Sequence, residues 1–167
     1  MGILPKIKAE DIRKNAKTDD PWDFLFLFTD KYFEMINEKP EIVQEFNDSQ
    51  NVLLGFNYLY DEINNYGFIQ LIANGKGQYI FNNIFIKKIR LWGAIKTCEI
   101  VEKAEILYKK YKTKLEREYT IDEFNKLCEE ITDFKPLDNM FFDIMDDETK
   151  IIKMYVEKNV DEFARVI

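Results

Sequence analysis

The sequence EINNYGFIQLIANG, at residues 62–75, indicates how the helices of this protein are connected. Asparagine, glycine and glutamine residues are interleaved here with a strongly apolar run. Because asparagine and glycine tolerate left-handed backbone conformations, the sequence predicts a tight corner between two helices at residues 64–67. The side chains of Glu62, Asn64 and Gln70 are expected to hydrogen bond with the backbone groups that such a corner leaves exposed.

Helical periodicity extends to both sides of this corner, and apolar residues recur every three or four positions. We predict an all-α fold: a single compact multi-helix bundle of about seven to nine helices, with residues 1–20 forming a polar arm or short helix before a helical domain at 21–167. The expected helices cover residues 21–38, 50–63, 68–73, 78–92, 94–114, 120–131, 137–145 and 148–158. Their expected start signals are Asp20 with Pro21, Asp48, the capping box from Thr120 to Glu123, and Asp146 or Asp147; Pro136 is expected to separate the sixth helix from the seventh. Aromatic and aliphatic residues at helical spacing, Phe26 and Ile106 among them, are assigned to the core.

The composition supports one helical domain of 167 residues. Apolar residues make up 46% of the chain, which is enough for a core, while only 6 glycines and 4 prolines interrupt it. Cys98 and Cys128 lie within apolar segments and are predicted to be reduced thiols. No stretch has the roughly 18–20 apolar residues that a membrane span needs, and we expect a cytoplasmic protein.

Histidine is absent from the chain. Its absence excludes Ser-His and Cys-His nucleophile systems, but it does not exclude acid and base catalysis by paired carboxylates. The segment from Asn74 to Gln78 is rich in glycine but lacks the Gly-Lys-Ser/Thr ending of a phosphate-binding loop. We therefore predict no cofactor and no metal, and we predict that the protein is not an enzyme.

The net charge of −7 is distributed unevenly. Residues 1–60 contain 11 acids and 7 bases, residues 61–119 contain 7 acids and 11 bases, and residues 120–167 contain 13 acids and 6 bases. Such a surface disfavours direct binding to nucleic acid, whose affinity depends on phosphate neutralisation by lysine and arginine. A basic protein partner is the better expectation.

Several acids of the last third are spaced three or four residues apart, so that they would follow one side of a helix. Such a stripe could imitate the phosphates of a DNA strand, although lysines interrupt it and an ordinary solvated face is the alternative. The predicted partner-binding residues are Glu129, Asp133, Asp143, Asp146, Asp147, Glu157 and Asp161.

Residues 62–75 also carry a family resemblance. Glu62, Asn65, Gly67, Phe68, Gln70 and Asn74 match the pattern Glu-x-x-Asn-Gly-Gly-Phe-x-Gln, followed by an apolar run and Asn. Tyr66 stands where the first glycine of that pattern is usual. The chain resembles the DNA-mimic-protein-like (DMP-like) family of small, uncharacterised helical domains of bacteria. The resemblance implies an all-helical domain without known enzymatic activity, and at least one such relative binds a transcription factor by presenting carboxylates in place of DNA phosphates.

Three functions are consistent with these observations. The first is a non-enzymatic binding module that presents an acidic helical face to a basic partner, as a DNA mimic does to a DNA-binding regulator. The second is an immunity or inhibitor protein that blocks the basic active site of a toxin enzyme. The third is a carboxylate-dependent hydrolase in which Glu62 is the acid or base. The sequence leaves open whether the protein also forms a homodimer.

Overall fold

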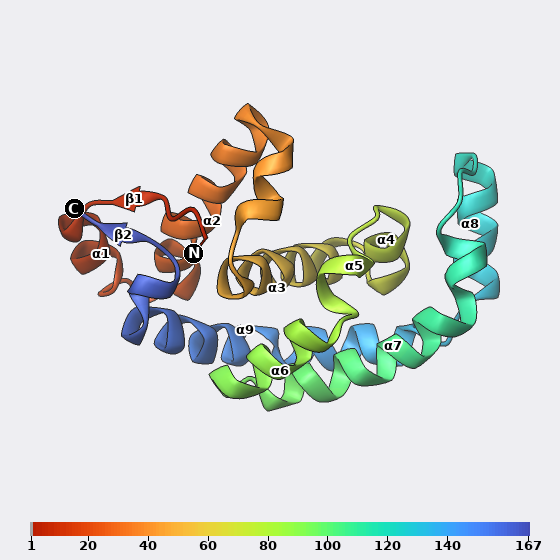
Figure 1. The fold of residues 1–167 in the computed structure, drawn as a ribbon. Helices are drawn as coiled ribbons and strands as arrows, with labels where there is room; N and C mark the ends of the chain where they lie inside the picture. Colours follow the sequence, from red (N-terminus) through yellow and green to blue (C-terminus); the bar gives the residue numbers. More distant parts are fainter. Residues whose placement is uncertain (1) are drawn as a thin grey trace.

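A computed structural model describes residues 2–167. Over that range the chain forms nine α-helices, two short 3-10 helices and one pair of two-residue strands (Figure 1), which confirms the predicted all-α fold. The elements are, in order, β1 (Lys6–Ile7), α1 (Ala9–Asn15), α2 (Pro21–Glu38), η1 (Pro40–Glu45), α3 (Asp48–Asn65), α4 (Phe68–Ala73), α5 (Gly77–Ile80), α6 (Asn83–Trp92), α7 (Ile95–Leu115), α8 (Ile121–Glu130), α9 (Lys135–Lys158), η2 (Val160–Glu162) and β2 (Arg165–Val166).

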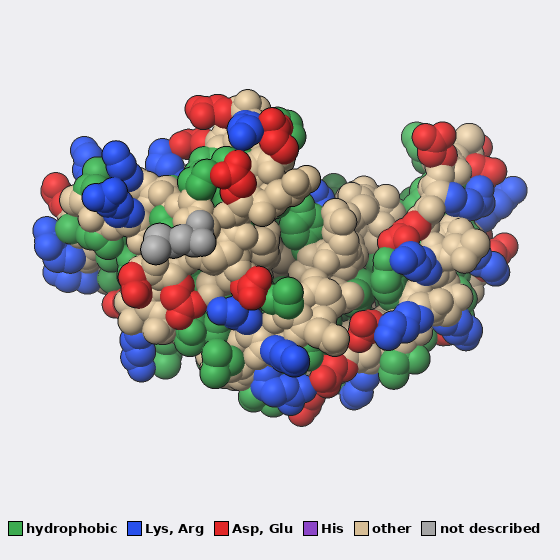
Figure 2. All heavy atoms as spheres, viewed as in Figure 1, with side chains coloured by type: hydrophobic (Ala, Val, Ile, Leu, Met, Phe, Trp, Pro, Cys, Tyr) green, Lys and Arg blue, Asp and Glu red, His purple; other side chains and the backbone are tan. Residues whose placement is uncertain are grey.

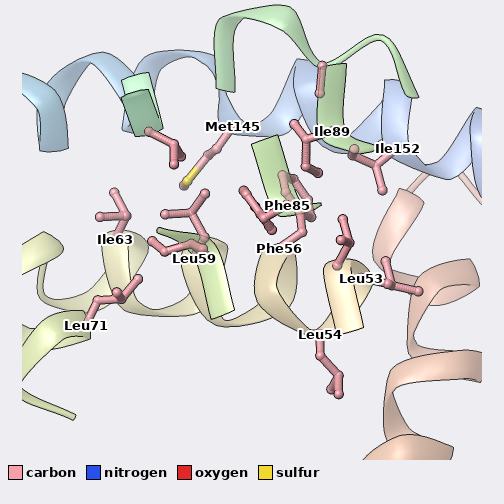
Figure 3. Close-up of a cluster of buried hydrophobic side chains, with 14 of the residues drawn as sticks. Leu53, Leu54, Phe56, Leu59, Ile63, Leu71, Phe85, Ile89, Met145 and Ile152 are labelled. Carbon is pink, nitrogen blue, oxygen red and sulfur yellow. The ribbon is translucent and has the colours of Figure 1, made fainter. Parts of the chain in front are cut away.

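Helix α3 lies at the centre of the hydrophobic core. Five consecutive residues, 52–56, are all buried, as expected for a helix that is covered on every side. Phe56 and Leu59 point toward the side chains that α6 and α9 contribute, while Leu54 points away from that cluster (Figure 3). Helices α2, α4, α5, α6 and α9 all contact α3.

Helices α7 and α9 pack against each other along their length and form the long base of the molecule (Figure 1). The buried residues of α9 recur at helical spacing along one side: Leu137, Phe141, Met145, Glu148, Thr149, Ile152 and Val156. Helix α8 projects from one end of this base, whereas both chain ends lie at the opposite end (Figure 1).

Helix α9 corrects one of our predictions. We expected Pro136 to separate two helices and Asp146 or Asp147 to cap the second, but residues 135–158 form one continuous helix. Pro136 lies in its first turn, where a missing backbone N–H costs nothing because that group has no partner within the helix. Asp146 and Asp147 are therefore in the middle of α9 and exposed to solvent.

Two of the predicted helix starts are confirmed, and two others differ from the prediction. Asp20 caps α2 by accepting a hydrogen bond from the Trp22 backbone N–H, and Thr120 begins α8 with the predicted capping box. Helix α3 is capped by Asn47 and not by Asp48. The predicted helix at residues 78–92 is two helices, because Asn82 turns the chain and caps α6 through the Phe85 N–H.

Several residues assigned to the core are on the surface. Phe26 is 42% exposed, Ile95 is 41% exposed and Ile106 is 70% exposed, so the prediction for these side chains was wrong. No helix of residues 2–167 is long and apolar enough to cross a membrane.

The two ends of the chain pair with each other. Strands β1 and β2 run parallel, with Lys6 opposite Arg165. The Arg165 N–H donates to the Pro5 carbonyl at 2.8 Å, and the Ile167 N–H donates to the Ile7 carbonyl at 3.0 Å. The first residues therefore pack against the last, and helix α1 lies near the position where a short helix was expected.

Candidate protein-binding surface

The carboxylates of α9 fall into two classes according to the side of the helix from which they project. Two that project inward cap the N-termini of other helices. Asp138 accepts a hydrogen bond from the Phe68 N–H at the start of α4, at 2.8 Å. Glu148 accepts from the backbone N–H and the hydroxyl of Thr97 in the first turn of α7, both at 2.9 Å. Both side chains accept hydrogen bonds from N–H groups that have no partner within their own helices, so they hold the fold together.

Asp138 explains why a glycine occupies position 67. The backbone of Gly67 has φ of 107° and ψ of 178°, a conformation that is almost restricted to glycine. A Cβ atom at this position would lie 2.7 Å from an oxygen of Asp138. The corner therefore requires glycine both for its backbone conformation and for the close approach of the carboxylate that caps α4.

The remaining motif residues form hydrogen bonds around the same corner. Asn74 donates to Glu62 Oε1 at 2.8 Å and accepts from the Gln70 amide at 2.9 Å. The backbone carbonyl of Glu62 accepts from the N–H groups of residues 66 and 67. The Glu62 side chain, which the hydrolase alternative needed as an acid or base, is buried within this network.

Asn65 and Phe68 complete the motif. Asn65 donates to the backbone and side chain of Asp61, one turn earlier in α3. The Phe68 ring is fully buried and lies near Phe81 and Phe134, with ring centroids 6.4 and 6.1 Å away. All six motif residues therefore lie in or beside the corner between α3 and α4.

Burial raises the pKa of Asp138 to about 6, although the hydrogen bond from Phe68 opposes that shift. The carboxyl loses hydration against the corner and is compensated by a single backbone N–H. This cap is therefore sensitive to pH in the mildly acidic range.

The second class of carboxylates projects outward from α9. Asp143, Asp146, Asp147 and Glu157 are all exposed, and we call these four residues the α9 carboxylate stripe. Residues three or four apart on a helix lie on the same side, with Cβ atoms roughly 5–6 Å apart, so the first three form one cluster. Glu157 follows about 15 Å farther along the axis from Asp147, at 1.5 Å per residue.

The stripe is only partly neutralised. Lys150 pairs with Asp147 at 3.4 Å and Lys153 pairs with Glu157 at 3.2 Å. Neither Asp143 nor Asp146 forms an ion pair with a described residue. These two aspartates are thus the part of the stripe most available to an external cation.

The other predicted acids do not join the stripe. Asp133 lies just before α9, where the Tyr111 hydroxyl and Lys110 bind it and hold its pKa below the usual range. Glu129 is exposed on the projecting helix α8, and Asp161 lies in η2 beyond the other end of α9. A helix of 24 residues is about 36 Å long, so the seven predicted residues are spread over the length of the molecule.

Sequence reasoning missed the groups from other helices that lie beside the stripe. The Tyr60 hydroxyl on α3 donates to Asp146 Oδ1 at 2.7 Å. Burial, followed by this hydrogen bond, raises the pKa of Tyr60 to about 12, so the phenol stays protonated and remains a donor. Asp20 is close enough to Tyr60 in the structure to raise its pKa, and Asp61 directly follows Tyr60 in the sequence. No local pattern connects residue 60 with residue 146, and only the packing of α3 on α9 brings them together.

The positively charged side chains gather over helices other than α9. On the face seen in Figure 2, many lysine and arginine side chains lie over α6 and α7, in the segment with excess positive charge. Helix α9 lies behind α6 and α7 in this view (Figure 1). Within residues 2–167, no group of three or more histidine, cysteine, aspartate or glutamate side chains is arranged to hold a metal ion.

Known proteins are similar to this chain over most of its length. The model of the family described as DMP19-like protein matches residues 44–159, well over half of the chain. The chain is also 25% identical over 162 residues to the DNA mimic protein DMP19 of Neisseria meningitidis serogroup B (strain ATCC BAA-335 / MC58), and the match covers 94% of each protein. The matched region includes the motif corner, both helices that α9 caps and the whole α9 carboxylate stripe. The chain therefore belongs to the DMP19-like protein family.

Proposed function

We propose that this protein is a DNA mimic that binds a DNA-binding protein through the α9 carboxylate stripe. The observation that carries the proposal is that Asp143 and Asp146 are exposed, one turn apart on a continuous helix, and free of ion pairs with described residues. Exposed carboxylates that form no ion pair attract the lysine and arginine side chains of a DNA-binding protein that would otherwise contact phosphates. The name of the Neisseria relative supports the same role.

The spacing of the stripe suits this role. Asp146 and Asp147 lie about 4.5 and 6 Å from Asp143 along the helix axis, whereas phosphates follow one DNA strand at about 3.4 Å along its axis. From Asp143 to Glu157 the stripe spans about 21 Å, a length over which one strand carries roughly six phosphates. With four carboxylates over that length, the charge density along the stripe is lower than that of one DNA strand but comparable to it.

The basic surface over α6 and α7 affects the side from which a partner approaches. A positively charged partner is repelled from that side and attracted to α9, so approach from the α9 side is favoured. Because exposed charges are screened by salt, the complex should weaken as the ionic strength rises.

A competition experiment tests the proposal. The wild-type chain captures a protein from a lysate of its own organism, and the captured protein is identified, purified and bound to its own DNA site. Addition of the wild-type chain should release that DNA, because a mimic and the DNA occupy the same surface of the partner. The variant with Asp143, Asp146 and Asp147 changed to lysine should lose capture and competition.

A matched control separates the position of the charges from their number. Glu38, Glu41 and Glu118 are exposed and form no ion pair with a described residue, so changing all three to lysine alters the net charge equally. This control should bind like the wild type. Simultaneous binding of DNA and chain to the partner would refute mimicry, and capture of an enzyme inhibited by the chain would favour the inhibitor alternative.

A further inference from the structure

A small aromatic pocket opens beside the α9 carboxylate stripe. It is lined by Trp22, Phe26, Asn57, Tyr60 and Asp61, from α2 and α3, and has a volume of about 200 Å³. Pockets for drug-sized ligands enclose roughly 300–1,000 Å³. This pocket is therefore sized for a single side chain.

Three aromatic rings form the pocket walls. The Trp22 ring stacks on Phe26 with centroids 5.2 Å apart and meets Tyr60 edge to face at 4.8 Å. Trp22 is 7% exposed, so its position is determined by packing, while Phe26 is 42% exposed. A ring so accessible to solvent offers a surface on which a planar group can stack.

Carboxylates surround these rings. Asp61 lines the pocket itself, and Asp146 of the stripe accepts the hydrogen bond from Tyr60 at 2.7 Å. Asp20, which caps α2 through the Trp22 N–H, is close enough to raise the pKa of Tyr60 electrostatically. None of these three aspartates forms an ion pair with a described residue.

We propose that this pocket receives an arginine side chain of the protein partner. Aromatic rings attract a cation through their electron-rich faces, and the attraction strengthens where carboxylates are nearby and water is partly excluded. Arginine fits better than lysine because its planar guanidinium stacks on rings and can donate two parallel hydrogen bonds to one carboxylate. The inference rests on the proposed function, since it assigns one arginine of a DNA-binding protein to a defined position beside the stripe.

The pocket can be tested without any partner. Trp22 and Trp92 are the two tryptophans of the chain, and Trp92 is buried against Tyr155 and Phe163, away from the pocket. In a titration of the full ¹⁵N-labelled chain with N-acetylarginine amide, the Trp22 indole resonance should move while that of Trp92 stays in place. N-acetyllysine amide should cause a smaller shift at the same concentration. An unmoved Trp22 resonance, or equal shifts with the two amides, would overturn the assignment to arginine.

Variants test the same pocket in the complex. Phe26→Ala removes one stacking surface and should weaken binding of the purified partner by about 5- to 30-fold. Ile106→Ala truncates another exposed apolar side chain, on α7, and should leave the affinity unchanged within about twofold. Asp61→Asn should weaken binding in the same direction as Phe26→Ala, with no change in the urea midpoint.

The two proposals fail in different ways. If Phe26→Ala binds the partner as tightly as the wild type while the stripe variant does not, the arginine pocket is wrong and DNA mimicry stands. If the arginine amide binds at Trp22 but the captured partner binds its DNA and the chain together, mimicry is wrong. The pocket then keeps its preference for a guanidinium group.

Discussion

The carboxylate of Glu148 accepts two hydrogen bonds from Thr97, one from the backbone N–H and one from the hydroxyl, each at 2.9 Å. Both residues are almost fully buried, at 3% and 0% exposure, and they lie 51 positions apart in the chain. This contact joins α9 to the N-terminus of α7, and these two helices form the base of the molecule. The acidic character of α9 thus contributes to folding as well as to the surface charge.

Glu148→Ala should destabilise the protein by roughly 2–4 kcal/mol, because two buried donors of Thr97 lose their acceptor. Glu148→Gln retains an acceptor oxygen and should cost less. Urea unfolding followed by circular dichroism measures both variants. Glu99→Ala, an exposed change near the start of α7, the helix that Glu148 caps, is the control and should stay within about 0.5 kcal/mol of the wild type. Equal effects for Ala at 148 and at 99 would contradict the capping role.

Gly67→Ala should be more destabilising than Gly75→Ala, although both glycines have positive φ values, 107° and 73°. At Gly75 no atom lies within 4 Å of the added Cβ, so only the backbone conformation is penalised, by about 1–2 kcal/mol. At Gly67 the added Cβ would meet Asp138 at 2.7 Å in a conformation almost unique to glycine, and we expect at least about 3 kcal/mol. Thermal melts of the two variants make the comparison, and the steric argument fails if their losses are the same.

Asp138 should make the stability of the protein fall as the pH rises from about 4 to 7. Its pKa is about 6 in the folded protein and roughly 3.9 in an unfolded chain, so the folded state binds more protons in this interval and loses that advantage as the carboxyl ionises. One pKa unit corresponds to about 1.4 kcal/mol, and because solvent reaches part of this carboxyl we expect only about 1–2 kcal/mol in total.

Asp138→Asn is the variant that isolates this effect. It keeps an oxygen acceptor for the Phe68 N–H and cannot ionise, so its stability should approach or exceed that of the wild type as the pH increases. The quantity to follow is the difference in unfolding free energy between wild type and variant at pH 4.5 and pH 7.5. A difference that does not change with pH would show that Asp138 is not the group responsible.

Lys150→Ala should strengthen partner binding by about two- to threefold while barely changing stability. Lys150 pairs with Asp147 at 3.4 Å, and both side chains are largely exposed, so the pair contributes little to folding. Its removal leaves another free carboxylate in the stripe and increases the attraction of a basic protein. Calorimetry at 50 and 300 mM salt measures the affinity, and the gain should shrink at the higher salt. Weaker binding at both salt concentrations would argue against a purely electrostatic stripe.

The features predicted best from the sequence were those that depend on residues close together in the chain, such as the starts of helices. Asp20 beside Pro21 and Thr120 three residues before Glu123 carry complete start signals within one turn, and both helices begin there. Pro136 was misread because proline is acceptable in a first turn and disruptive in an interior, and its effect depends on where the preceding helix ends.

Only part of the candidate protein-binding surface could be predicted from the sequence. Asp143, Asp146 and Asp147 have helical spacing and could be grouped in advance, although the predicted helix break at residues 146–147 would have separated them. The pocket could not be found in this way, because Phe26 and Tyr60 belong to helices whose relative position is set by packing. Phe26 has the spacing of a core residue and is nevertheless exposed, and nothing in its local sequence distinguishes it.

The pairing of β1 with β2 has a practical consequence for handling this molecule. Both ends lie at the end of the molecule farthest from α8 (Figure 1), so a label attached at either end stays away from α8 and from the start of α9. The short strand pair thus anchors the segment that follows the last helix beside the segment that precedes the first.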